Sequence, residues 1–120
     1  MTLPIYIPWD EKLVHYNFGP DHPLAPIRVE LAMRLAQDLG VISEENLFGP
    51  VIPATREQLL RAHNADYIAA VIAAGADPQR IDVGFGLGSG DNPVFAGMHE
   101  ASARVAGATL MAANAVWSGQ

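Results

Sequence analysis

The sequence predicts an α/β protein built on a parallel sheet. Two short apolar runs, residues 3–7 (LPIYI) and 50–53 (PVIP), have the composition of buried strands. Segments with helical patterns follow both runs, and strands that alternate with helices favour parallel pairing. Two strands are few for a sheet that helices cover on both faces. The pattern therefore indicates the first part of a larger domain.

Glycine and proline set the bounds of the first elements after residues 3–7. Residues 10–25 contain two prolines among mixed polar groups and are predicted to be a loop. A helix is predicted from Pro26 to about Leu39. Proline is tolerated at the first position of a helix, and Gly40 is suited to end it.

Two further helices are predicted after residues 50–53. Thr55 and Gln58 have the spacing of a capping box, which indicates the start of a short helix. Asn64 is expected to cap another helix over about residues 65–74, and Gly75 is expected to stop it.

A glycine-rich loop precedes the last predicted helix. The loop spans residues 76–91 and includes GFGLGSGD, in which every second residue is glycine before Asp91. Pro93 is expected to open the longest helix, to about Trp117, with Asp91 or Asn92 as its N-cap. The glycines do not form a dinucleotide fingerprint, because a carboxylate at this point would repel a phosphate. A flexible loop at the rim of a site is the better interpretation.

Composition excludes several classes of partner. The net charge is −6 and the chain has only seven Lys and Arg residues, which argues against nucleic acid and anionic membrane surfaces. No cysteine is present, so disulfides and thiolate sites are excluded and a cytoplasmic location is expected. Arg104 and Asn114 interrupt the most apolar late segment, which is therefore a poor membrane span.

Arg28 has an unusual position in the predicted helix 26–39. On a helical wheel it lies in the middle of an apolar face formed by Leu31, Ala32, Leu35 and Leu39. Burying an unpaired guanidinium group is costly. Two interpretations stay open: Arg28 faces an internal functional space, or it extends past the helix end into water.

The histidines do not predict a metal site. No two of them have ligand spacing, and Ala103 stands where His99-Glu100 would need a second histidine to form a zinc-protease motif. His63, which precedes Asp66 and Tyr67, is expected to pack and to form hydrogen bonds. The histidines of the chain are His15, His22, His63 and His99.

Three segments in order resemble the N-terminal third of the histone deacetylase superfamily, and its bacterial acetoin-utilisation-type members in particular. They are HPLAPIRVELAMRL, LLRAHNADYIAAV and GSGDNPVFAGMHEASARVAGATL, and the resemblance covers about residues 22–117. It implies an arginase-like three-layer fold, with a parallel sheet flanked by helices. It also implies a zinc-dependent hydrolase that removes acetyl or similar groups from acylated lysine or a related amine. In that chemistry the metal activates water, a histidine transfers protons and a tyrosine stabilises the oxyanion.

The resemblance also assigns roles to individual residues. Asp91 matches a rim aspartate that accepts hydrogen bonds from the substrate backbone, with Gly88 and Gly90 beside it in the substrate-binding loop. Arg28 matches an arginine that lines an internal channel below the active site. His63 and Tyr67 match an architectural helix motif.

The resemblance places the paired catalytic histidines, the metal ligands and the catalytic tyrosine after the last predicted helix. Residues 1–120 are therefore expected to be the N-terminal portion of a single deacetylase-like domain, without a catalytic residue or bound zinc. Zinc is expected in the full-length protein. The alternatives are a non-catalytic binding or scaffolding protein and an arginase-type relative. Self-association is expected through an uncovered sheet edge and uncovered helix faces.

Overall fold

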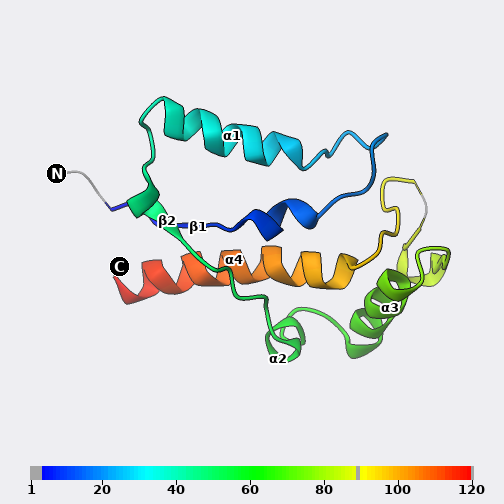
Figure 1. Cartoon of the computed structure of the whole chain (residues 1–120). Coiled ribbons are helices and arrows are strands. Elements are labelled where there is room, and N and C mark those ends of the chain that lie inside the picture. Colours follow the sequence, from blue (N-terminus) through cyan, green and yellow to red (C-terminus); the bar gives the residue numbers. More distant parts are fainter. Residues whose placement is uncertain (1–3, 89, 120) are drawn as a thin grey trace.

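The computed structural model describes residues 4–88 and 90–119. The chain forms an open layer with principal extents of 51 × 33 × 19 Å. The elements are β1 (Ile7–Pro8), η1 (Glu11–His15), α1 (Ile27–Asp38), η2 (Glu44–Asn46), β2 (Leu47–Phe48), α2 (Arg56–Leu59), α3 (Ala65–Ala76), η3 (Val83–Phe85) and α4 (Met98–Ser118), where η denotes a 3-10 helix. Helix α1 packs on η1, α4 packs on η1 and β1, and α3 packs on α4 (Figure 1).

The two strands pair in parallel, which confirms the α/β class and the parallel pairing. Ile7 lies opposite Leu47 in this pair, and the Trp9 amide donates to the Phe48 carbonyl at 3.0 Å. The ring of Tyr6 stacks on Phe48 at a centroid distance of 4.0 Å. The predicted strand 3–7 overlaps β1 only at Ile7, and its first residue lies outside the described residues.

The predicted strand at residues 50–53 is wrong, because β2 comes earlier and the backbone of this segment bonds to other partners. The Val51 amide donates to Asp10 Oδ2 at 2.8 Å, and the Val51 carbonyl accepts from Arg104 at 2.8 Å. The Ala54 amide donates to the Ala103 carbonyl in α4 at 2.8 Å. Within this run Val51 is buried, although Ile52 is exposed, and the segment crosses α4 instead of joining the sheet.

Asp10 joins three parts of the fold, and we expect Asp10→Ala to lower the free energy of unfolding by about 2 kcal/mol. Its Oδ1 accepts from the Lys12 amide and caps η1, while its Oδ2 accepts from the Val51 amide and lies 3.6 Å from Arg104. The substitution leaves the partly buried Val51 amide unpaired. Urea unfolding followed by circular dichroism measures the loss. Asp10→Asn keeps an acceptor oxygen and should lose about half as much, whereas equal losses would contradict this account.

The capping predictions for the helices before residue 77 are confirmed except at Gly75, which lies inside α3 against Met98 and does not stop this helix, because α3 ends at Ala76. Helix α1 follows Pro26, and Gly40 has the left-handed φ of 69° expected after a helix end. The capping box of Thr55 and Gln58 has both hydrogen bonds, at 3.2 and 2.8 Å. The Asn64 side chain accepts from the Asp66 amide at 2.8 Å at the start of α3. The loop predicted for residues 10–25 contains η1, which the prediction missed.

The prediction that Pro93 opens the last helix is wrong, because α4 begins at Met98 after Gly97. Gly97 has a φ of 73°, and its amide donates to the Gly75 carbonyl at 3.2 Å. Residues 93–97 stay extended or turned because Val94 and Phe95 pack against a buried cluster of Ala74, Leu87 and Met98. Tertiary packing therefore outweighs the helix-start signal of proline.

The helices α4 and α1 differ in how much of their apolar surface is buried within the described residues. Helix α4 buries Met98, Ala101, Ala103, Gly107 and Ala115, whereas Val105 and Val116 are exposed. Helix α1 has no buried residue, and its predicted apolar face is exposed.

Candidate functional site

Two adjoining cavities lie where the start of α1 approaches η1, α4 and the loop before α4. The inner cavity has a volume of about 420 Å³ and is lined by Leu13, Tyr16, Leu24, Ala25, Pro26, Arg28, Val29, Val105, Ala108 and Thr109. The outer one is an open depression of about 640 Å³, lined by Tyr16, Phe18, His22, Pro23, Leu24, Arg28, Asp91 and Asn92. Tyr16, Leu24 and Arg28 belong to both.

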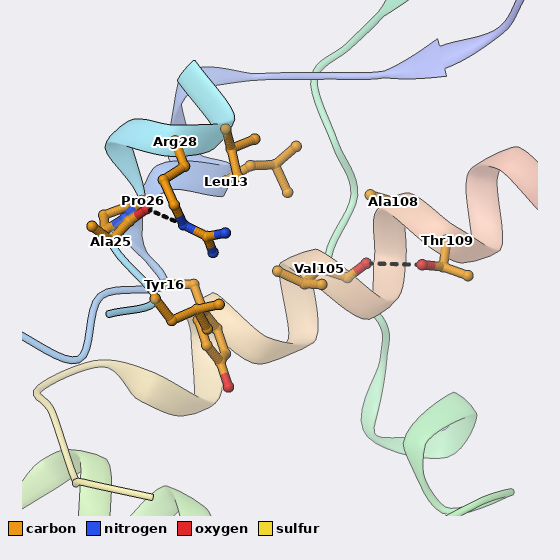
Figure 2. Close-up of a pocket in the computed structure, with 10 residues that line it drawn as sticks. Leu13, Tyr16, Ala25, Pro26, Arg28, Val105, Ala108 and Thr109 are labelled. Carbon is orange, nitrogen blue, oxygen red and sulfur yellow. Dashed lines mark hydrogen bonds between the residues drawn. The ribbon is translucent and has the colours of Figure 1, made fainter. Parts of the chain in front are cut away.

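Arg28 lies at the boundary between the two cavities. Its guanidinium group points into the space between the start of α1 and α4, beside Tyr16 and Val105 (Figure 2). Its Nε donates to the Ala25 carbonyl at 3.2 Å, which fixes the first part of the side chain. Arg28 is exposed, so the apolar face around it is not a buried environment in this chain. Its terminal nitrogens can donate to an anion in either cavity.

Asp91 also lines the depression and is exposed. It cannot cap α4, which begins seven residues later, so the predicted capping role is wrong for both Asp91 and Asn92. Among residues 4–88 and 90–119, no donor forms a hydrogen bond with the Asp91 carboxylate. The carboxylate can therefore accept hydrogen bonds from a ligand in the depression.

Gly88 and Gly90 shape the loop that carries Asp91. Their φ angles are 92° and 56°, a region that glycine adopts without strain. A Cβ on Gly88 would also stand 3.1 Å from the Ile81 side chain. The Gly88 amide donates to the Asn92 carbonyl at 2.8 Å, which closes the loop around Asp91. Neither glycine is among the described residues that line the depression, so their predicted substrate contact stays a prediction.

An aromatic cluster fixes the depression against the loop. Phe95 meets Tyr16 and Phe18 edge to face at centroid distances of 5.6 and 5.5 Å, and Tyr16 meets Phe18 at 5.2 Å. Such pairs stabilise their arrangement by about 0.5–1.5 kcal/mol beyond burial. The cluster therefore holds the segment that follows Asp91 against the segment that precedes α1.

His22 is a site residue that the sequence did not single out. Its Nδ1 accepts from the Leu24 amide at 3.0 Å, so the neutral ring carries its proton on Nε2. The ring packs on Phe18 at a centroid distance of 4.5 Å. Its Nε2 is buried and has no hydrogen-bond partner within the described part of the chain. The only sequence signal was the position of His22 before Pro23, which does not reveal this turn.

His63 and Tyr67 lie apart from the two cavities. Their ring centroids are 5.4 Å apart, and the centroid of Tyr67 lies 5.9 Å from that of Phe85, so the two rings pack, while the hydrogen bonds expected of His63 stay a prediction. Residues 4–88 and 90–119 contain no group of three or more His, Asp or Glu side chains arranged to hold a metal ion. The donors of this part of the chain do not fit zinc, which takes three or four protein ligands.

The fold and the matched segments together define the class of protein. The histone deacetylase domain family matches residues 22–120, and the chain belongs to this family. Over 107 residues it is 41% identical to the acetoin utilization protein AcuC of Bacillus subtilis (strain 168), covering 88% of this chain. It is 31% identical to AcuC of Staphylococcus aureus (strain MRSA252) and 32% identical to the histone deacetylase clr6 of Schizosaccharomyces pombe, over 93% and 92% of this chain.

The chain spans only 27% of the length of the Bacillus relative, and 29% and 28% of the other two. The resemblance to acetoin-utilisation-type members is therefore confirmed, and it covers a little more than a quarter of the length of these relatives. Within the described residues, no helix combines the length and apolar character needed to cross a membrane.

Proposed function

We propose that this chain is the N-terminal portion of a zinc-dependent deacetylase and forms part of its substrate rim and inner channel. One observation carries the proposal: Arg28 and Asp91, 63 residues apart in sequence, line the same open depression. The Asp91 carboxylate suits a substrate with amide donors. The Arg28 guanidinium group suits a product with a carboxylate.

The two charged residues would have separate roles. Asp91 would accept hydrogen bonds from backbone amides of a substrate that carries an acylated lysine or a related amine, and so orient it. Arg28 would attract the carboxylate released by hydrolysis into the apolar inner cavity, whose volume of about 420 Å³ exceeds that of a short acyl group. Tyr16 and Leu24 would exclude water where the two cavities meet.

Zinc and the groups that transfer protons are proposed to belong to the longer protein, because the described residues do not fit a zinc ion. No chemical step is assigned to this chain alone. We extend the proposal to an arginase-like three-layer fold for the complete domain, which the parallel β1–β2 pair supports. A cytoplasmic location is proposed on the absence of cysteine.

A non-catalytic binding or scaffolding protein is the alternative. The exposed apolar face of α1 favours it, because such a surface suits a protein partner. The match to the histone deacetylase domain favours the deacetylase over an arginase-type relative.

A chimaera tests the proposed function and the role of Arg28. In it, this chain replaces the matching segment of the Bacillus subtilis relative, and the product is assayed on an acetyl-lysine peptide. We expect measurable hydrolysis, and Arg28→Met should lower turnover about tenfold, because one charge-assisted contact with the departing carboxylate is lost. Inhibition by added acetate should weaken as well.

Arg34→Met is the matched control on the same helix. Arg34 is exposed and pairs only with Glu30 at 2.6 Å among the described residues, so this change should leave turnover near that of the parent chimaera. If Arg28→Met keeps full turnover and acetate inhibition, Arg28 merely extends into water. A folded but inactive chimaera would contradict the proposed function itself.

The isolated chain is proposed to self-associate. The two strands have uncovered outer edges within the described sheet, and apolar side chains of α1 are exposed. Light scattering at increasing protein concentration should give a weight-average mass above the 12.8 kDa of one chain. A single mass of 12.8 kDa at high concentration counts against it.

A further inference from the structure

A cavity of about 220 Å³ lies between α3, the start of α4 and the loop that joins these two helices (Figure 1). We call it the aromatic cavity, because five aromatic rings line it: Tyr16, Phe18, Tyr67, Phe85 and Phe95. Asn92 and Ser102 add an amide and a hydroxyl group to the lining. Because Tyr16, Phe18 and Asn92 also line the open depression, the two spaces adjoin.

Ser102 has a hydroxyl group that its own helix does not use. The other two hydroxyl residues of α4, Thr109 and Ser118, donate to carbonyls four positions earlier, at 3.4 and 2.8 Å. Within residues 4–88 and 90–119, neither the Ser102 hydroxyl nor the Tyr67 hydroxyl has a hydrogen-bond partner. Both residues are half-buried and line the aromatic cavity. Their hydroxyl groups can therefore bond to a ligand inside it.

The lining selects a small, neutral and flat ligand. Among the described residues no charged side chain lines the aromatic cavity, so a charged ligand would lose its hydration without gaining a partner. The five rings offer edge-to-face and offset contacts to a further ring. An apolar cavity of about 150 Å³ in another protein holds benzene, so the volume here suits one substituted ring. A hydroxyl on that ring can replace a water that bonds to the polar groups.

We propose that the aromatic cavity binds a small neutral phenol, with the ring between the aromatic side chains and the hydroxyl bonded to Ser102. Burial of the ring supplies most of the affinity, and the hydroxyl group supplies the selectivity for a phenol over the same ring without a hydroxyl. The inference does not rest on the proposed catalytic role, because none of the residues that hold the ligand is assigned a role in hydrolysis.

The test compares 4-fluorophenol with 4-fluorotoluene, each titrated with the chain of residues 1–120 and followed by fluorine NMR. A ligand this small is expected to bind with a Kd of about 1 mM. Ser102→Ala should weaken binding of the phenol about fivefold and change that of the toluene less than about twofold, because only the phenol loses a hydrogen bond. Thr109→Val is the matched control, because it removes an α4 hydroxyl from the inner cavity instead. It should leave the binding of both ligands unchanged.

Two further variants locate the ring. Phe85→Ala removes one wall and should weaken both ligands about tenfold. Ala106→Leu is its control, because Ala106 lines a neighbouring cavity of about 150 Å³ that shares Ser102 but not Phe85. It should leave both Kd values unchanged. Circular dichroism should show the helix content of the parent in every variant, since none of the replaced side chains is fully buried.

The proposal is overturned if 4-fluorophenol does not bind at about 10 mM, ten times the expected Kd. It is also overturned if Ser102→Ala weakens both ligands equally, because the hydroxyl group is then not recognised. Loss of phenol binding in Thr109→Val would place the ligand in the inner cavity, and the same loss in Ala106→Leu would place it in the neighbouring cavity. Either result contradicts the assignment to the aromatic cavity. No outcome depends on deacetylase activity.

Discussion

Gly107→Ala is expected to destabilise the fold by at least about 3 kcal/mol, which is a large part of the stability of a small domain. Gly107 lies where residues 52–54 cross α4. A Cβ at this position would overlap the Ile52 carbonyl oxygen and stand 2.9 Å from the Ala54 nitrogen. These atoms belong to the backbone, and the hydrogen bond from Ala54 to Ala103 holds the crossing in place. Urea unfolding followed by circular dichroism should show the loss.

Gly75→Ala is the matched control, because it makes the same change inside α3. A Cβ at Gly75 would lie 3.3 Å from the Met98 nitrogen, a tight contact that a small shift relieves. Alanine favours helix over glycine by about 1 kcal/mol at both positions, so propensity alone would stabilise both variants. We expect Gly75→Ala to change stability by less than about 1 kcal/mol. If Gly107→Ala is equally stable, segment 52–54 does not cross α4 as described.

Local chemistry was enough to predict the starts of the α-helices before residue 77. Thr55 with Gln58 and Asn64 before α3 act through hydrogen bonds to residues two or three positions away, so the sequence contains all the necessary information. Gly40 ends α1 for the same reason. These elements were predicted to within a few residues.

Long-range contacts decided the elements that were predicted wrongly. Residues 50–53 have strand composition, yet Asp10, Arg104 and α4 take their backbone hydrogen bonds. Pro93 is a good first helix residue, yet Phe95 packs against the cluster that contains Ala74, and α4 begins only at Met98. The residues that these segments contact are distant in sequence, so no local pattern could reveal the outcome.

The candidate site was predicted in part. The resemblance to the deacetylase superfamily selected Arg28 and Asp91, and both line the depression. Periodicity suggested a special place for Arg28 but could not identify the cavity, because η1 and α4 supply the opposite walls. His22 was missed because its significance depends on the turn that bonds Nδ1 to Leu24.

Asp91→Asn and Asp91→Ala are expected to lower kcat/KM by about tenfold to several hundredfold in the chimaera described above. Each charge-assisted hydrogen bond that a carboxylate accepts from a substrate amide contributes about 1.5–3 kcal/mol, and about 1.4 kcal/mol corresponds to tenfold in rate. Because α4 begins at Met98, neither variant removes a helix cap. Both should therefore keep the thermal stability of the parent within about 0.5 kcal/mol. Assays on an acetyl-lysine peptide and thermal unfolding measure the two effects separately.

Asp21→Asn separates a direct contact from long-range electrostatics. Asp21 is exposed, lies in the loop before α1 and is not among the described lining residues of the depression. The substitution removes the same charge as Asp91→Asn from a protein whose net charge is −6. An effect of overall charge would therefore slow hydrolysis by Asp21→Asn and Asp91→Asn alike. We expect Asp21→Asn to retain the parent activity.

A shorter substrate tests the contact with the backbone amides directly. On acetyl-lysine without backbone amides on either side, the parent chimaera and the Asp91 variants should have the same kcat/KM. If Asp91→Asn matches the parent on the peptide, Asp91 does not orient substrate through its charge.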